Sequence, residues 1–193
     1  SLGNVTDQAN ATNRFQSISK VPLLIGMDAE WGIGMRLSDA FSFPYNMTLG
    51  AVQEDDLIYK VGKRIGVHAK RLGVHINFAP VTDINTNPKN PIIGSRSFGE
   101  DKINVTKKSL AYLKGMQSEG IMGSAKHFPG HGDTSQDSHK TLPTINFSSK
   151  RINDIELHPY KELIKNNLSG VMVAHMEVPS LEKTPKLPST LSK

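Results

Sequence analysis

Four apolar runs, three of them followed by a polar loop and a helical stretch, constrain the fold of this sequence most strongly. The runs span residues 21–27, 74–80, 121–128 and 170–176. Continuous apolar runs of this length are typical of strands buried on both faces, as in parallel sheets. Apolar residues at helical spacing occupy residues 54–72, 101–120 and 149–164. This alternation predicts an α/β fold with a parallel sheet.

Local signals place the ends of the expected helices. Acidic residues fill the first turn from Glu54, and Gly73 is expected to end that helix in a left-handed conformation. Asp101 is a candidate N-cap for the second helix, and Pro159 is expected to kink or divide the third. Residues 1–20 are polar and fit either a short helix or a frayed arm.

The loops that follow the strands are long and polar, whereas the helix-to-strand turns are short. This asymmetry is typical of a (β/α)₈ TIM barrel, whose active site is built from the loops after the strands. A doubly wound sheet is the alternative, but residues 28–35 match its glycine-rich phosphate turn poorly. Because only four strands are visible and a closed barrel has eight, either the terminal parts of the barrel are hidden or this chain is a piece of a larger protein. Residues 1–20 and the barrel segment 21–193 are expected to form one partial domain.

Composition narrows the classes of function. The net charge is +5, but the lysines are scattered, as on solvated helix faces, so no nucleic-acid surface is expected. No apolar run approaches the roughly 20 residues of a membrane span. The chain has no cysteine, which fits the cytoplasm or the periplasm equally. Residues 1–4 show no signal peptide, although one could have been removed.

Charged and imidazole side chains follow every expected strand. In parallel strands these groups converge at one edge of the sheet, so we expect them to form a site. In chain order they are Asp28 and Glu30, Asp83 and Arg96, Lys126 and His127, Asp137 and His139, and His175 and Glu177.

Several of these groups have both a functional and a structural interpretation. Asp137 lies two residues from His139, where the carboxylate can orient the imidazole as a proton shuttle, or the two can be a polar pair on a surface loop. Lys126 and His127 can hold a hydroxylated ligand, or be a buried ion pair and a core histidine. Arg96 can clamp a ligand or pin its own loop.

Two further interpretations concern a metal and an aromatic platform. His127, His131, Asp133 and His139 contain enough ligands for a metal-dependent hydrolase, but their spacing matches no zinc pattern, so we predict no metal and no other cofactor. Trp31 can stack on a sugar, although packing over the end of a barrel is the commoner role of such a residue.

Five motifs, in order along residues 21–188, resemble the N-terminal barrel of glycoside hydrolase family 3. The last of them is similar to the bacterial β-N-acetylglucosaminidase branch of that family. The motifs are Leu-Leu-Ile-Gly-Met-Asp-Ala-Glu at 23–30, Phe-Ala-Pro-Val-Thr-Asp at 78–83, Ile-Gly-Ser-Arg-Ser-Phe at 93–98, Lys-His-Phe-Pro-Gly-His-Gly-Asp at 126–133 and Asp-Ser-His at 137–139.

This resemblance implies a retaining β-N-acetylhexosaminidase that removes terminal β-linked N-acetylglucosamine, acting on cell-wall-derived sugars such as those of bacterial peptidoglycan. His139 would be the acid/base and Asp137 its partner. The positions that would hold the sugar's hydroxyls are Asp28, Arg96, Lys126 and His127, and His175 would line the pocket.

The family's aspartate nucleophile follows a later strand, and its motif is absent from these residues. It is therefore expected beyond residue 193, and the 193-residue chain alone is expected to be inactive. By the same resemblance, residues 21–193 correspond to the middle portion of the barrel, about strands 3 to 6 of eight. A β-glucosidase-like or phosphorolytic enzyme and an inactive carbohydrate-binding fragment are the alternatives. An incomplete barrel would expose two sheet edges, so self-association or companion segments are also expected.

Overall fold

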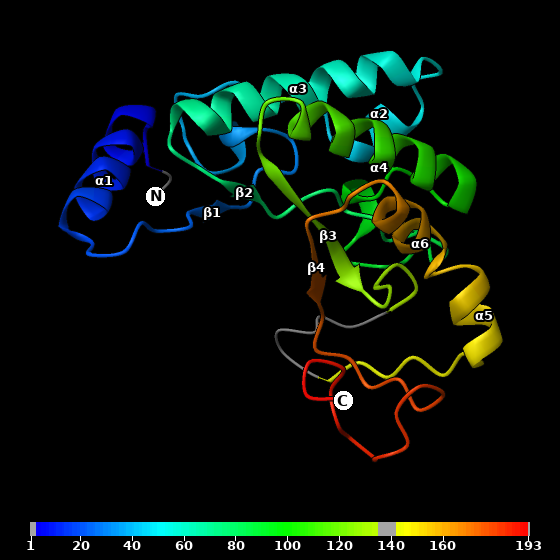
Figure 1. Ribbon diagram of the computed structural model, residues 1–193. Coiled ribbons are helices and arrows are strands. Elements are labelled where there is room, and N and C mark those ends of the chain that lie inside the picture. Colours follow the sequence, from blue (N-terminus) through cyan, green and yellow to red (C-terminus); the bar gives the residue numbers. More distant parts are fainter. Residues whose placement is uncertain (1–2, 135–141, 193) are drawn as a thin grey trace.

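A computed structural model describes residues 3–134 and 142–192 as four strands with helices between them (Figure 1). The strands are β1 (Gly26–Met27), β2 (Ile76–Asn77), β3 (Met122–Phe128) and β4 (Gly170–Val173). The helices are α1 (Val5–Ile18), α2 (Asn46–Gly50), α3 (Asp55–Arg71), α4 (Lys102–Gln117), α5 (Ser149–Asp154) and α6 (His158–Lys165). Two 3₁₀ turns, η1 (Ile33–Met35) and η2 (Gly94–Arg96), lie in the loops after β1 and β2.

The four strands form one parallel sheet in the order β1-β2-β3-β4. Gly26 pairs with Ile76, Ile76 with Met122, and Ser124 with Gly170. Helix α3 packs on α4, and α4 on α6, so the helices follow one another alongside the strands (Figure 1). Neighbouring parallel strands in sequence order, with no reversal of strand order, form part of a barrel wall and not a doubly wound sheet. The predicted portion of an α/β barrel is confirmed.

Three strands are shorter than the apolar runs predicted. Residues 21–25 lie outside β1, Val21 is 74% exposed, and Pro22 has no N–H group to donate to a neighbouring strand. In the same way β2 is limited to two residues, and residues 174–176 lie beyond the end of β4. An apolar run indicates a strand, but the number of paired residues depends on its neighbours.

The helix ends follow the predicted signals. Helix α3 is followed by Gly73 at a φ of +70°, and the Asp101 carboxylate accepts from the Asn104 N–H at 2.7 Å to cap α4. The third helical stretch divides into α5 and α6, with Pro159 in the first turn of α6. Residues 1–20 were expected to form either a short helix or a frayed arm. The helix is correct, since α1 forms there and is capped by Asn4. The short helix α2 was not predicted.

The core lies between the sheet and the helices α3, α4 and α6. Ile58 and Ile65 of α3 and Leu113 and Met116 of α4 are completely buried there. Helices α3 and α4 approach each other closely through a glycine on each, Gly62 and Gly115. A Cβ atom on Gly62 would lie 2.2 Å from the Tyr112 carbonyl oxygen, so the contact has no room for a side chain.

Some apolar surface remains exposed at both ends of the sheet. Val171 and Val173 of β4 are each 38% exposed, and Leu24 before β1 is 66% exposed. Within the described ranges, β1 and β4 each pair with one other strand. No helix in the described part of the chain is both long enough and apolar enough to cross a membrane.

Candidate functional site

Side chains from three successive strand ends meet at the carboxyl edge of the sheet. The Lys126 ammonium, on β3, donates to the Asp28 carboxylate at 2.8 Å and lies 2.7 Å from a Glu30 oxygen. Both acids follow β1, so these contacts reach past the intervening strand β2. The Lys126 side chain is only 3% exposed, which means that its charge is neutralised by these two carboxylates and not by solvent.

Glu30 also holds Arg96, which lies in the loop after β2. Arg96 binds the carboxylate through two N–H groups, with Nε to Oε2 at 3.0 Å and Nη2 to Oε1 at 2.7 Å. Such a two-point contact fixes the plane of the guanidinium. The backbone of Glu30 is held as well, because the buried Tyr112 hydroxyl contacts the carbonyls of Ala29 and Glu30 at 3.1 Å each.

Asp83, just beyond β2, organises the end of β3. Its carboxylate lies 2.6 Å from Nδ1 of His127 and accepts the backbone N–H of His131 at 2.7 Å. It also accepts the backbone N–H of His127, at 3.2 Å. The peptide bond between Lys126 and His127 is cis. The other ring nitrogen of His127, Nε2, lies 3.2 Å from Nη2 of Arg96.

Burial separates two groups of charged side chains. The side chains of Glu30 and Asp83 are completely buried. Asp28, Arg96 and His127 are 32%, 24% and 14% exposed. The exposed group can touch a ligand at the edge of the sheet, and the buried group can act only through its neighbours.

The three carboxylates have lowered pKa values. Burial alone would raise the pKa of Glu30, but the Arg96 hydrogen bonds and the Lys126 charge lower this pKa by more than burial raises it. The pKa of Asp28 is lowered in the same way, by Lys126 and Arg36 against the effect of burial, and that of Asp83 by His127 and the His131 N–H. Glu30 in turn raises the pKa of Arg96, against the effect of burial. All three acids are therefore ionised near neutral pH, so they can accept hydrogen bonds but cannot supply a proton.

Four of the predicted site residues, Asp28, Arg96, Lys126 and His127, come together in this network. The structural alternatives were also right for some of them: Lys126 forms a buried ion pair, and Arg96 pins its own loop through the Ile92 carbonyl. His175 lies elsewhere, exposed after β4, with its Nδ1 2.8 Å from the Thr190 hydroxyl. Asp137 and His139 lie outside the described residues.

Glu30 and Asp83 were expected at the site because each follows a strand end, but neither was assigned a role there, and nothing in the sequence showed that they are buried. Arg36 carried no signal; it donates to the Asp28 carboxylate at 2.6 Å.

The aromatic and metal interpretations have different outcomes. Trp31 packs edge-on against Tyr45, with ring centroids 4.7 Å apart, as expected for packing. His131 is 1% exposed, contacts the Thr134 hydroxyl, and has a pKa that burial lowers. Within residues 3–134 and 142–192, no three metal-ligating side chains group together. His139, part of the predicted metal set, lies outside those ranges.

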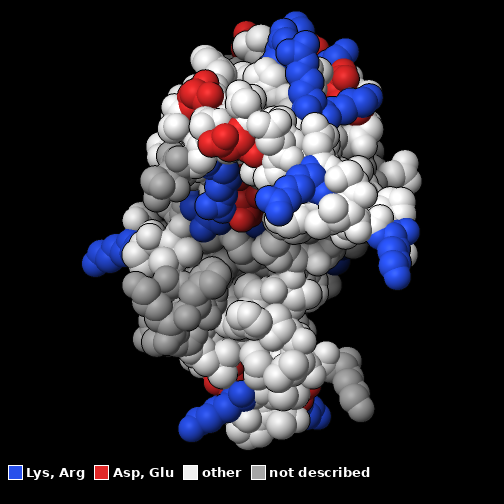
Figure 2. Space-filling model, turned by 90° about the vertical axis from the view of Figure 1, so that its left-hand side faces the viewer, with Lys and Arg blue, Asp and Glu red and all other residues white. Residues whose placement is uncertain are grey.

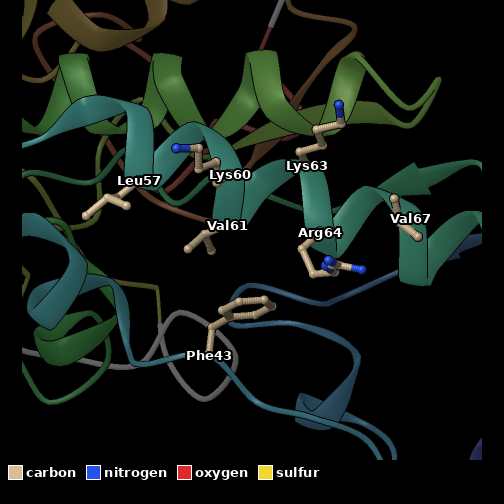
Figure 3. A pocket seen from close by; sticks show the side chains of 7 residues that line it. All are labelled: Phe43, Leu57, Lys60, Val61, Lys63, Arg64 and Val67. Atoms are coloured by element: carbon tan, nitrogen blue, oxygen red, sulfur yellow. The ribbon is translucent and has the colours of Figure 1, made fainter.

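A separate groove of about 550 Å³ lies on the outer side of α3 (Figure 3). Phe43 faces Val61 and Arg64 across it, and no carboxylate or imidazole lines it. By contrast, basic and acidic side chains lie next to one another near the middle of the face in Figure 2. Among the described residues, the network of Asp28, Glu30 and Lys126 therefore lies at the carboxyl edge of the sheet and not in the groove.

Comparison with known proteins identifies one family. The profile described as the glycosyl hydrolase family 3 N terminal domain matches residues 2–193. Beta-hexosaminidase A of Pseudoalteromonas piscicida is 42% identical over 175 residues, which are 88% of this chain and 29% of that protein. This chain therefore spans about a third of that relative.

Two solved structures are similar over nearly the whole chain. A glycoside hydrolase family 3 beta-N-acetylglucosaminidase from Paenibacillus sp. str. FPU-7 superimposes with a TM-score of 0.91 at 39% identity, over 97% of this chain and 36% of that one. Beta-glucoside phosphorylase BglX superimposes with a TM-score of 0.89 at 28% identity, over 93% of this chain and 33% of that one.

Proposed function

This chain belongs to glycosyl hydrolase family 3, as part of its N-terminal domain, and on that basis we propose that the protein is a retaining β-N-acetylhexosaminidase. Its substrate would carry a terminal β-linked N-acetylglucosamine, as cell-wall-derived sugars do. Relatives named beta-hexosaminidase and beta-N-acetylglucosaminidase support this choice of sugar.

The network of Asp28, Arg96, Lys126 and His127 is the observation that carries the proposal. A sugar presents neighbouring hydroxyls that each donate and accept a hydrogen bond. The ionised and partly exposed Asp28 offers acceptors, and the partly exposed Arg96 offers donors. Lys126, which is almost fully buried, holds Asp28 within the same hydrogen-bonded cluster. Because Glu30 fixes both cations, this surface is ordered before a ligand arrives.

We assign the proton transfers to His139 and its partner Asp137. A nucleophilic aspartate from outside these residues attacks the anomeric carbon, and the bond to the leaving oxygen breaks as His139 gives that oxygen a proton. Water then attacks the glycosyl-enzyme, its proton passes to His139, and the sugar leaves. This assignment agrees with the lowered pKa values of Asp28, Glu30 and Asp83, which make all three unsuitable as the proton donor.

The test is hydrolysis of aryl β-N-acetylglucosaminides by the full-length protein and its His139→Gln variant. Loss of a general acid is expected to lower kcat about 10²- to 10⁴-fold. The loss should be smaller for a nitrophenol leaving group, which departs without a proton, than for a more basic phenol. His158→Gln, on α6, is the matched control and should keep the wild-type rate. An unchanged rate in His139→Gln, or no hydrolysis by the wild type, would refute the proposal.

Phosphorolysis is a second candidate, favoured by the similarity to a protein named beta-glucoside phosphorylase. Here a phosphate oxygen replaces water at the anomeric carbon and releases the sugar 1-phosphate. A neutral histidine, unlike a carboxylate, does not repel that anion. Product analysis with and without inorganic phosphate decides: free sugar alone supports hydrolysis, and sugar 1-phosphate supports phosphorolysis. Preference for an aryl β-glucoside over the N-acetylglucosaminide would instead favour a β-glucosidase.

A further inference from the structure

Asp83 accepts more hydrogen bonds than any ligand-facing residue in the network, although no ligand can reach it. Its side chain is completely buried, and its two oxygens receive the backbone N–H groups of His127 and His131 and face Nδ1 of His127. All of its partners lie at the end of β3 or directly after it. The carboxylate therefore fixes the backbone and the ring of the same residue, His127.

The contacts of Arg96 determine which nitrogen of His127 carries the proton. A guanidinium has five N–H groups and accepts no hydrogen bond. The contacts of Arg96 engage four of the five: two with Glu30, one with the Ile92 carbonyl and one with His127. For the contact of 3.2 Å to be a hydrogen bond, Nε2 of His127 must accept. The proton of the neutral ring then lies on Nδ1, where it is donated to Asp83 at 2.6 Å.

We propose that Asp83 is a positioning residue that holds His127 in the neutral Nδ1–H form, so that Nε2 keeps the lone pair that accepts from Arg96, or from a sugar hydroxyl that takes the place of Arg96. A protonated ring would bring an Nε2–H group against an Arg96 N–H, with two cations in contact. The opposite neutral form would place a lone pair of Nδ1 against the Asp83 carboxylate. Only the Nδ1–H form satisfies both contacts.

The sugar ligand in this inference rests on the proposed function. The main measurement does not depend on that function. Nitrogen-15 NMR of the wild-type protein labelled at histidine distinguishes the forms of His127, whose signals are assigned by their loss in His127→Gln. We expect a protonated, pyrrole-type Nδ1 and an unprotonated, pyridine-type Nε2 near neutral pH. An imidazolium ring, or a proton on Nε2 alone, would overturn the proposal. This measurement needs no variant of Asp83 to fold.

The variant Asp83→Asn adds a second measurement. Its amide N–H₂ group can donate to Nδ1 while its oxygen still accepts the two backbone N–H groups, so the proton of His127 should move to Nε2 and the contact with Arg96 should be lost. We expect the Kd of N-acetylglucosamine to increase about 10- to 100-fold, by analogy with residues that orient the ligands of metal sites. Asp101→Asn is the matched control, because asparagine caps a helix as well as aspartate does.

The two hypotheses fail in different ways. If Asp83→Asn folds with unchanged His127 signals and unchanged affinity, Asp83 does not position the ring, whatever the protein does. If the wild type does not bind N-acetylglucosamine but His127 is in the Nδ1–H form, the proposed substrate is wrong and the role of Asp83 stands.

Discussion

At the scale of single residues, the site separates the side chains that can touch a ligand from those that hold them. Glu30 contacts Lys126 at 2.7 Å and accepts two hydrogen bonds from Arg96, yet its own side chain has no exposed surface. Asp28 shares Lys126 but is 32% exposed and also binds Arg36. Loss of a buried acid leaves its cations without a partner, whereas water can replace some of the contacts that an exposed acid makes.

Glu30→Gln is therefore expected to cost about 3–5 kcal/mol of unfolding free energy near neutral pH, and more than Asp28→Asn. The folded-state pKa of Glu30 is lowered, so its contribution is present above its unfolded pKa and is lost as the pH falls through the folded value. The difference between wild type and variant should thus shrink below about pH 4. Denaturant unfolding at pH 7 and at acid pH measures both effects. A larger loss in Asp28→Asn would contradict this reading of the network.

Glu156 has the opposite electrostatic behaviour. Glu156 is 8% exposed and lies beside Gly130. Burial raises the pKa of Glu156, although Arg151 lies 3.2 Å from its carboxylate. A raised pKa means that the fold is more stable below the unfolded pKa and loses stability as the pH rises through the folded value. Glu156→Gln should therefore melt at a higher temperature than the wild type at pH 7, with no gain near pH 4. Equal differences at both pH values would show that ionisation is not the cause.

At the scale of elements, the contact of α3 with α4 depends on having no side chain at Gly62. Nearby on the same helix, Gly66 is less restricted, since a Cβ atom there would lie 3.1 Å from its closest neighbours. Both Gly→Ala changes favour the helix by about 1 kcal/mol through its propensity. The difference between the stabilities of the two variants therefore measures the contact of α3 with α4 at Gly62.

Gly62→Ala should destabilise the protein relative to Gly66→Ala, by about 1–3 kcal/mol from forced separation of the two helices. The measurement is thermal or denaturant unfolding of the two variants beside the wild type. If Gly62→Ala is the more stable of the two, the helices do not meet at this point as described.

The elements also show what the sequence can and cannot predict. Helix ends depend on neighbouring residues, and Gly73, Asp101 and Pro159 were placed correctly for that reason. The strands were located but made too long, because pairing depends on a partner far away in the chain. Asp28, Arg96, Lys126 and His127 were predicted to meet other groups that follow strands, and the family resemblance singled out these four. His175, which belonged to the larger set, lies elsewhere. The buried role of Asp83 was not predicted, since only the packed structure shows which carboxylate points inward.

At the scale of the whole molecule, the sheet has two edges that carry exposed apolar side chains. Strands at such edges are paired on one side only, so they can pair with strands of other chains. We expect the 193-residue chain, made alone, to form oligomers in size-exclusion chromatography with light scattering. Val171→Lys together with Val173→Lys, on β4, should reduce this association, because charge on an edge strand opposes pairing. A monodisperse monomer of the unaltered chain would contradict the prediction.

The bond between Asp28 and Lys126 joins residues 98 positions apart in the chain. A ribosome adds residues at about 5–20 per second, so Asp28 and Glu30 wait about 5–20 s before Lys126 is even made. Arg96 is also made before Lys126, so it can reach Glu30 first. The order of synthesis thus gives the network an order of assembly, in which β3, carrying Lys126 and His127, is made after the acids that these residues join.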